Sequence, residues 1–97
     1  MESRAKNPEP IEKEAIADLK FPADEILKDA DAIKTRTIEL ERALKLGNLE
    51  KSKINIVFED QHGVKQVNTT IWGVTDKRVI LKQGVVIPIN RIHEVKI

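Results

Sequence analysis

The chain of 97 residues contains no cysteine and no tyrosine, and its only aromatic residues are Phe21, Phe58 and Trp72. Without cysteine there are no disulfides, no thiol catalysis and no cysteine-based zinc sites, which fits a reducing cytosol. No apolar run approaches the ~20 residues that a membrane-spanning helix needs, and the charged start of the chain has no apolar segment behind it, unlike a signal peptide. These absences predict a soluble cytoplasmic protein with one modest, aliphatic core.

Residue types that carry catalysis or bind metals are also scarce. The only serines are Ser3 and Ser52, and the only histidines are His62 and His93. Neither histidine stands at a regular spacing from further metal ligands, and the four glycines are too scattered to form a phosphate-binding loop. The sequence therefore predicts a binding module that is not an enzyme, has no metal or other cofactor, and has no evident small-molecule substrate.

Charge is distributed unevenly along the chain, although the net charge is only +1. Residues 1–50 contain nine Lys or Arg and twelve Asp or Glu, whereas residues 51–97 contain eight and four. A basic second half is typical of proteins that bind polyanions such as RNA. Attraction between the acidic half and the basic half within one fold is the alternative explanation.

Residues 1–10 contain two prolines and few apolar side chains, so we expect a disordered leader. A helical arm is expected over residues 11–47. Its first part, residues 11–20, has apolar side chains at helical spacing. Pro22 ends this short helix, because the residue before a proline is disfavoured in the α conformation. The main helix is expected over residues 24–46.

The main helix is defined by apolar side chains that recur at alternating spacings of four and three residues. Gly47 and Asn48 follow it, and glycine or asparagine after a helix favours a left-handed end. The narrow apolar stripe has to pack on the sheet, on a partner helix or on a second copy of the chain. The stripe consists of Ile26, Ala30, Ile33, Thr37, Leu40 and Leu44, of which Ile26, Ile33, Leu40 and Leu44 are the candidate protein-interface residues.

Residues 51–97 alternate apolar and polar side chains in short runs that are separated by turn signals. We expect turns at residues 60–63 and at Gln83-Gly84, and a sharp bend at Gly73 within a long second strand. Five strands in so short a segment predict an antiparallel barrel and, with the helices, an α+β fold. The strands are expected at residues 53–58, 64–74, 78–82, 85–89 and 93–97, with Ile54, Ile56 and Phe58 of the first strand facing the core.

The segment GVTDKRVILKQGVVIPINRIHEV, residues 73–95, resembles the bend, strand, turn and closing strand of Sm-like and SH3-like small barrels. The resemblance extends over residues 36–97 and rests on architecture and apolar spacing. Sm and Hfq proteins, the Rho-binding antiterminator and the C-terminal barrel of a ribosome maturation factor are broadly similar. The resemblance implies a five-stranded SH3/Sm-like barrel behind the helical arm, and RNA or a ribonucleoprotein as the partner.

Two signatures of these families are absent from the sequence. The Asp-x-x-Asn nucleotide pocket of Sm proteins is missing, since Val79 stands three residues after Asp76. Residues 88–93 also lack the lysine-histidine signature that precedes the last strand of Hfq. The resemblance therefore implies the fold and the class of partner, and it carries over no nucleotide-binding residue.

The outward positions of the first three strands combine cations, amide side chains and the only tryptophan. Cations bind phosphates, amides read base edges and an indole stacks on bases, so this face predicts a contact with single-stranded RNA. The alternative is packing, in which apolar residues of the same face form a patch that the main helix covers. These apolar residues are Val57, Trp72, Ile80 and Val86, and the candidate nucleic-acid-binding residues are Lys53, Asn55, Asn68, Trp72, Arg78 and Lys82.

The sequence thus leads to two hypotheses. In the first, the protein binds RNA or a ribonucleoprotein through the basic barrel, and loop cations such as Lys51 and Arg91 follow the phosphate backbone. Cations that are simply solvated are the alternative explanation for these loops. In the second hypothesis, the protein is an interaction adaptor without a nucleic-acid role. It would bind a partner protein, or a second copy of itself as a homodimer, through the helix and the barrel edge.

Overall fold

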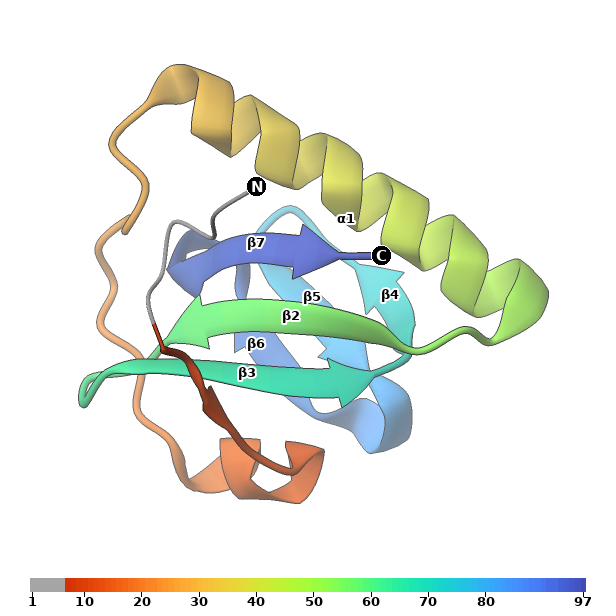
Figure 1. The fold of residues 1–97 in the computed structure, drawn as a ribbon, viewed down its shortest axis with the longest axis horizontal. Helices are drawn as coiled ribbons and strands as arrows, with labels where there is room; N and C mark the ends of the chain where they lie inside the picture. Colours follow the sequence, from red (N-terminus) through yellow and green to blue (C-terminus); the bar gives the residue numbers. More distant parts are fainter. Residues whose placement is uncertain (1–6) are drawn as a thin grey trace.

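The computed structural model describes residues 7–97, so residues 1–6 of the expected leader lie outside the described residues. In chain order, a short strand β1 (Glu9–Pro10) and a 3₁₀ helix η1 (Lys13–Asp18) precede one long helix, α1 (Ala30–Glu50) (Figure 1). The remaining elements are β2 (Ile54–Glu59), β3 (Val64–Thr69), β4 (Ile71–Val74), β5 (Arg78–Leu81), η2 (Lys82–Gly84), β6 (Val86–Pro88), η3 (Ile89–Arg91) and β7 (Ile92–Lys96).

The strands form two sheets, one with the order β1-β3-β2-β7 and one with the order β4-β5-β6. The α+β class is confirmed, but the predicted closed five-stranded barrel is wrong. The expected second strand, residues 64–74, is interrupted at Thr70, so that β3 belongs to one sheet and β4 to the other. At this break the Thr70 carbonyl accepts a hydrogen bond from the Lys82 backbone N–H at 3.2 Å, next to the Ile71–Leu81 pair, so Thr70 is already engaged with the second sheet.

The two helical segments bridge the two sheets on opposite sides. The long helix α1 packs against β4 and β7, which are end strands of different sheets, and η1 packs against β3 and β6 (Figure 1). By packing against β4 and β7, α1 shields two strand edges that would otherwise invite association with other chains. The helical segments are therefore part of the core rather than an attached arm, and Ile16 of η1 and Leu40 of α1 are both buried in it.

The inner faces of the strands follow the predicted alternation. Ile54, Ile56 and Phe58 of β2 are buried in the core, as expected from the period of two. Phe21, which lies between η1 and α1, packs on Phe58 with a ring separation of 6.0 Å. The other strands contribute Val67, Ile71, Val79, Leu81, Ile87, Ile92 and Val95 to the same core.

The start of the chain departs from the expected disorder at Glu9–Pro10, which pair in parallel with Lys65 and Gln66 of β3. The Gln66 side chain donates to the Pro8 carbonyl at 3.0 Å, and the Ile11 N–H donates to the Gln66 carbonyl at 2.9 Å. These bonds use the free edge of β3, which composition alone does not show. The short helix expected over residues 11–20 is confined to the 3₁₀ helix η1.

The long helix begins and ends later than predicted. It begins at Ala30 instead of residue 24, after Asp29, whose side chain accepts a hydrogen bond from the Asp31 N–H at 3.1 Å. It runs through Gly47 to Glu50, and the left-handed residue that follows is Lys51, with φ 55°. The predicted end at Gly47 is wrong because this glycine serves packing: a Cβ atom here would collide with the Ile71 carbonyl oxygen of β4.

Replacing Gly47 by alanine is expected to lower the free energy of unfolding by about 1–3 kcal/mol, because the new methyl group forces α1 away from β4. The intrinsic helix propensity of alanine, about 1 kcal/mol better than glycine, acts in the opposite direction. Urea unfolding measures the difference, with Lys45→Ala on the exposed face of α1 as control. A Gly47→Ala variant more stable than the wild type would show that the contact is not tight.

Candidate nucleic-acid interface

A groove of about 650 Å³ lies where the end of α1, the β3–β4 corner, the start of η1 and the turn η2 meet. Its position is set by segments that are far apart in the sequence. The groove is lined mainly by cations, amides and hydroxyl groups. The lining residues are Glu12, Lys13, Gly47, Asn48, Lys51, Lys53, Asn68, Thr69, Thr70, Trp72 and Lys82.

Four lysines border this groove against a single acidic residue, Glu12, within the described part of the lining. Lys13 forms an ion pair with Glu14 at 2.9 Å, outside the groove lining. The other three, Lys51, Lys53 and Lys82, are exposed, and none forms an ion pair with another described residue. Their charges are not neutralised by the fold, so the groove attracts anions.

Thr70 holds the cation-bearing segments together at one end of the groove. Its carbonyl accepts from the Lys82 N–H at 3.2 Å, and its hydroxyl donates to the Lys51 carbonyl at 3.5 Å. The left-handed conformation of Lys51 turns the chain from α1 towards β2. The close contact between Gly47 and the β3–β4 corner brings the end of α1 to the same place. These contacts fix the backbone from which the lysine side chains project.

The only tryptophan lies in the groove lining and is 54% exposed. The expectation that α1 covers an outer patch of Val57, Trp72, Ile80 and Val86 is not met: Val86, like Trp72, is exposed, at 42%, while Ile80 is half-buried and Val57 is buried. The helix does not lie over this face, because it spans the end strands β4 and β7. An exposed indole beside lysines can stack on an unpaired base.

The structure brings together four of the six candidate nucleic-acid-binding residues, Lys53, Asn68, Trp72 and Lys82. Asn55 is not in the groove lining; its Nδ2 donates to Gln66 Oε1 across the β2–β3 ladder at 2.9 Å. Arg78 is also absent from it and lines a separate apolar pocket. Six further polar residues of the described lining were not among the candidates: Glu12, Lys13, Asn48, Lys51, Thr69 and Thr70.

Only some of the additional groove residues could have been found from the sequence. Lys51 is one of the predicted loop cations, and Asn48 was interpreted as a helix end because it follows a glycine. No local pattern marks Lys13, which reaches the groove because η1 packs on β3. Alternation along a strand predicts which side a residue faces, but it does not predict which other segments lie beside it.

Of the four candidate protein-interface residues, only Leu40 is buried. Leu40 belongs to the core with 2% of its surface exposed, and Ile33 and Leu44 are half-buried against the body of the protein. Ile26 precedes α1, and its N–H donates to the Asn90 carbonyl at 3.1 Å. The buried side of α1 is rotated from the predicted stripe and consists of Ala32, Arg36, Leu40, Ala43 and Gly47.

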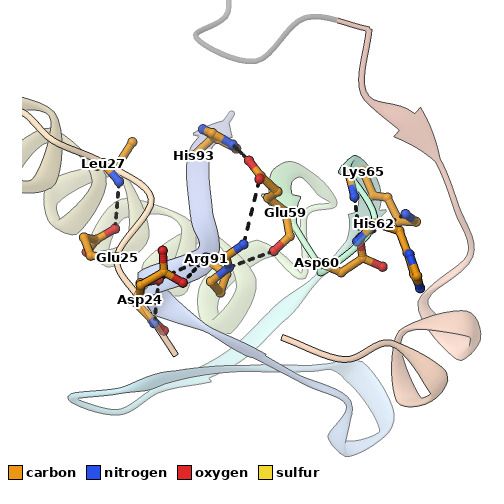
Figure 2. A network of polar contacts seen from close by, with 11 residues as sticks. Asp24, Glu25, Leu27, Glu59, Asp60, His62, Lys65, Arg91 and His93 are labelled. Carbon is orange, nitrogen blue, oxygen red and sulfur yellow. Dashed lines mark hydrogen bonds and ion pairs between the residues drawn. The ribbon is translucent and has the colours of Figure 1, made fainter. Parts of the chain in front are cut away.

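A polar network fastens the segment before α1 to the sheet (Figure 2). Arg91 is buried; its Nε donates to the Glu59 carbonyl at 3.1 Å, and its Nη1 donates to the carbonyl and the carboxylate of Asp24 at 3.0 and 3.1 Å. The Glu59 carboxylate also meets the Nε2 of His93 at 2.9 Å. Arg91, predicted as a loop cation for phosphates, is therefore engaged in structural contacts.

A second buried arginine, Arg36, points from α1 to the Glu25 carboxylate, with distances of 2.8 and 2.6 Å from its two terminal nitrogens. It also donates to the Ile92 carbonyl of β7 at 3.0 Å. Partial burial would raise the pKa of Glu25, but hydrogen bonds from Arg36 and from the Leu27 N–H outweigh it and hold the pKa below 4.5. This ion pair joins three segments of the fold.

The predicted turn at residues 60–63 is present and is built around Asp60, whose side chain is buried. Its Oδ1 accepts hydrogen bonds from the backbone N–H groups of His62 and Gly63, both at 2.9 Å, and lies 3.2 Å from Lys65 Nζ (Figure 2). Burial would raise the pKa of Asp60, but the bonds from His62, Lys65 and Gly63 outweigh it, so the pKa lies below 3.8.

Replacing Asp60 by asparagine is expected to lower the free energy of unfolding at pH 7 by about 1–2 kcal/mol. Because the pKa of Asp60 is lowered by folding, its charge stabilises the protein above pH 3.8, and this stabilisation is lost as the pH falls through the folded-state value. The difference in the free energy of unfolding between the wild type and Asp60→Asn should therefore become smaller at acidic pH. Chemical denaturation at several pH values measures it, with the exposed Asp76→Asn as control. A gap independent of pH would contradict the role of the charge.

Comparisons with known proteins found no match to this chain among family models, curated proteins or solved structures. Within residues 7–97, no three histidine or acidic side chains come together as a set that could hold a metal ion. No helix in the described part of the chain has both the length and the apolar character needed to cross a membrane. The geometry of the groove is therefore the observation from which a function can be argued.

Proposed function

We propose that this protein binds single-stranded RNA, free or within a ribonucleoprotein, in the groove between the end of α1 and the β3–β4 corner. The observation that carries the proposal is the convergence of three lysines without ion-pair partners in the described structure, Lys51, Lys53 and Lys82, on a half-exposed Trp72. The lysines would neutralise phosphates, and the indole would stack on one base.

The shape and chemistry of the groove support a single strand as the ligand. Bases are available for stacking on an aromatic ring only when they are unpaired. The exposed amides of Asn48 and Asn68 lie in the same lining and supply donors and acceptors for a base edge. The resemblance of residues 36–97 to RNA-binding small barrels supports the same class of partner, and we propose that the two sheets are an open form of that barrel plan.

The salt dependence of binding follows from the number of lysines. Each neutralised phosphate of a single strand contributes about −0.7 to the slope of log K against log salt, so three lysine contacts give a slope of about −2. Binding is therefore expected to be weak and tolerant of sequence at physiological salt. A steeper slope would require cations from outside the groove.

The direct test is a titration of labelled, mixed-sequence single-stranded RNA at low and near-physiological salt, with tryptophan fluorescence recorded in parallel. Trp72 is the only tryptophan, so any quenching reports on the groove itself. Replacing Trp72 by alanine is expected to weaken binding by about 1–3 kcal/mol, or roughly 5- to 150-fold, while the salt slope is unchanged. Trp72→Phe, which keeps a ring, should retain part of the affinity.

Two results would contradict the proposal. The first is the absence of binding at low salt, where electrostatic attraction is strongest. The second is binding that leaves the Trp72 emission unchanged, since the ligand would then lie elsewhere. The adaptor hypothesis has less support, because Leu40, at the centre of its proposed interface, is buried in the core of the protein's own fold.

A further inference from the structure

Arg78, a predicted RNA-binding residue, lies at a second pocket whose chemistry differs from that of the groove. This pocket has a volume of about 350 Å³ and lies between the η1 segment and β6. Among the described residues, Arg78 is the only charged one in this lining, and it is exposed. Its guanidinium forms no ion pair with another described residue. The apolar lining residues include Ile16, Leu19, Phe21, Val85, Val86 and Pro88.

One wall of this pocket is an end strand. In the sheet order β4-β5-β6, β6 has a strand neighbour on one side only. The Leu81 N–H donates to the Val85 carbonyl at 2.7 Å, and the Ile89 N–H donates to the Lys77 carbonyl at 2.9 Å, so residues 85 and 89 face β5. Because hydrogen-bonding directions alternate along an antiparallel strand, the backbone N–H and C=O of Val86 face the open side.

We propose that this pocket, defined by η1, β6 and Arg78, binds a short extended peptide of a partner protein that carries an apolar residue next to an acidic one. The apolar side chain would fill the pocket, the carboxylate would pair with the Arg78 guanidinium, and the peptide backbone would bond to Val86. A cavity of this volume, mostly apolar with a few polar groups at its rim, is typical of ligand sites.

Charge and edge together point to an acidic peptide. Arg78 is a cation at an apolar pocket whose described lining includes no acid. It also lines a neighbouring pocket with Glu25 and Asp76 but forms no ion pair with either, so its charge favours an anionic group on the ligand. The outward N–H and C=O of Val86 can form hydrogen bonds with the backbone of an extended peptide. The acyl chain of a simple fatty acid has no groups that could form these bonds. The pocket also opens to the surface, where Val86 is exposed, so one anchor side chain can enter while the rest of the peptide remains outside.

The test uses fluorescein-labelled octapeptides of glycine and serine with a central leucine flanked by glutamates, by lysines or by serines, measured by fluorescence polarisation. The glutamate peptide should bind at least about tenfold more tightly than the lysine peptide, and exchange of the leucine for alanine should remove most of the binding. Arg78→Glu should reverse the preference between glutamate and lysine peptides. Arg42→Glu, the same change on the exposed side of α1, should leave it unaltered.

Two further variants separate this pocket from the basic groove. Ala17→Trp, at an exposed residue of the pocket lining, should block all peptides while circular dichroism shows an unchanged fold. The triple variant Lys51→Glu, Lys53→Glu, Lys82→Glu should bind the glutamate peptide as the wild type does. Loss of peptide binding in that triple variant, equal binding of glutamate and lysine peptides, or no binding by any peptide would each overturn the proposal.

Discussion

Replacing Glu25 by glutamine is expected to lower the free energy of unfolding at neutral pH by about 2–3 kcal/mol. The change leaves the guanidinium of Arg36, which is 3% exposed, buried without a carboxylate. The expected loss is smaller than the roughly 3–5 kcal/mol typical of breaking a fully buried ion pair, because the Glu25 side chain is still one-third exposed. Urea unfolding measures the effect, with Glu41→Gln on the exposed side of α1 as the control.

A double-mutant cycle shows whether the loss comes from the unpaired charge. Arg36→Met removes the buried charge and keeps most of the side-chain volume, so it should cost less than Glu25→Gln. The double variant should be about as stable as Arg36→Met alone, since glutamine then leaves no charge unpaired. If the two single losses were additive, the Arg36–Glu25 contact would not be the cause.

The same pair contributes to the pH dependence of stability. Folding lowers the pKa of Glu25 below 4.5, so the carboxylate stabilises the folded state above that pH, and the stabilisation is lost as the pH falls through the folded-state pKa. The difference in stability between the wild type and Glu25→Gln should therefore shrink in acid. A difference that grew on acidification would show that the pKa of Glu25 is raised rather than lowered.

Reversing the charges of the groove is expected to have the largest effect on RNA binding. The triple variant Lys51→Glu, Lys53→Glu, Lys82→Glu should bind single-stranded RNA at least about 30-fold more weakly at low salt. The slope of log K against log salt should become shallower by about 2, because three phosphate contacts are lost. All three side chains are exposed, so the free energy of unfolding should change little. Filter binding at several salt concentrations measures the RNA affinity and its salt slope.

The matched control is the triple variant Lys20→Glu, Lys28→Glu, Lys45→Glu. It has the same change in net charge, and its lysines are exposed but do not line the groove. This control should lose much less affinity, and its salt slope should change little. If both triple variants lost affinity equally, net charge rather than the groove would determine binding, and the proposed site would be wrong.

The local features of this protein can be derived from its sequence alone. The period of two placed Ile54, Ile56 and Phe58 on the inner face of β2, because side chains of a strand point alternately to its two sides. Asp60 and Gly63 predicted a turn over residues 60–63. The Asp60 side chain accepts a hydrogen bond from the Gly63 N–H, and glycine adopts the positive φ that the turn needs. Such features depend on neighbours in the chain, so they can be derived from the sequence.

Tertiary structure decided how the elements face one another. The side of α1 that is buried includes Arg36, a residue that a hydrophobic pattern places outside, because Glu25 and the Ile92 carbonyl lie within hydrogen-bonding distance of it. The exposure of Trp72 depended on α1 spanning β4 and β7 rather than covering the outer face. Neither outcome follows from a periodicity, since both depend on contacts between segments far apart in sequence.

The composition of the groove also depends on contacts between segments that are far apart in the sequence. Lys53, Asn68, Trp72 and Lys82 could be named from alternation and residue type, but their convergence with Lys13 required η1 to pack on β3. The division into two sheets in place of a closed barrel likewise involves distant segments, since the chain is interrupted at Thr70, whose carbonyl accepts a hydrogen bond from the Lys82 N–H. The sequence determined which side chains could bind an anion; the packing of distant segments decided which of them share a site, because a strand or helix pattern contains no information on its partners.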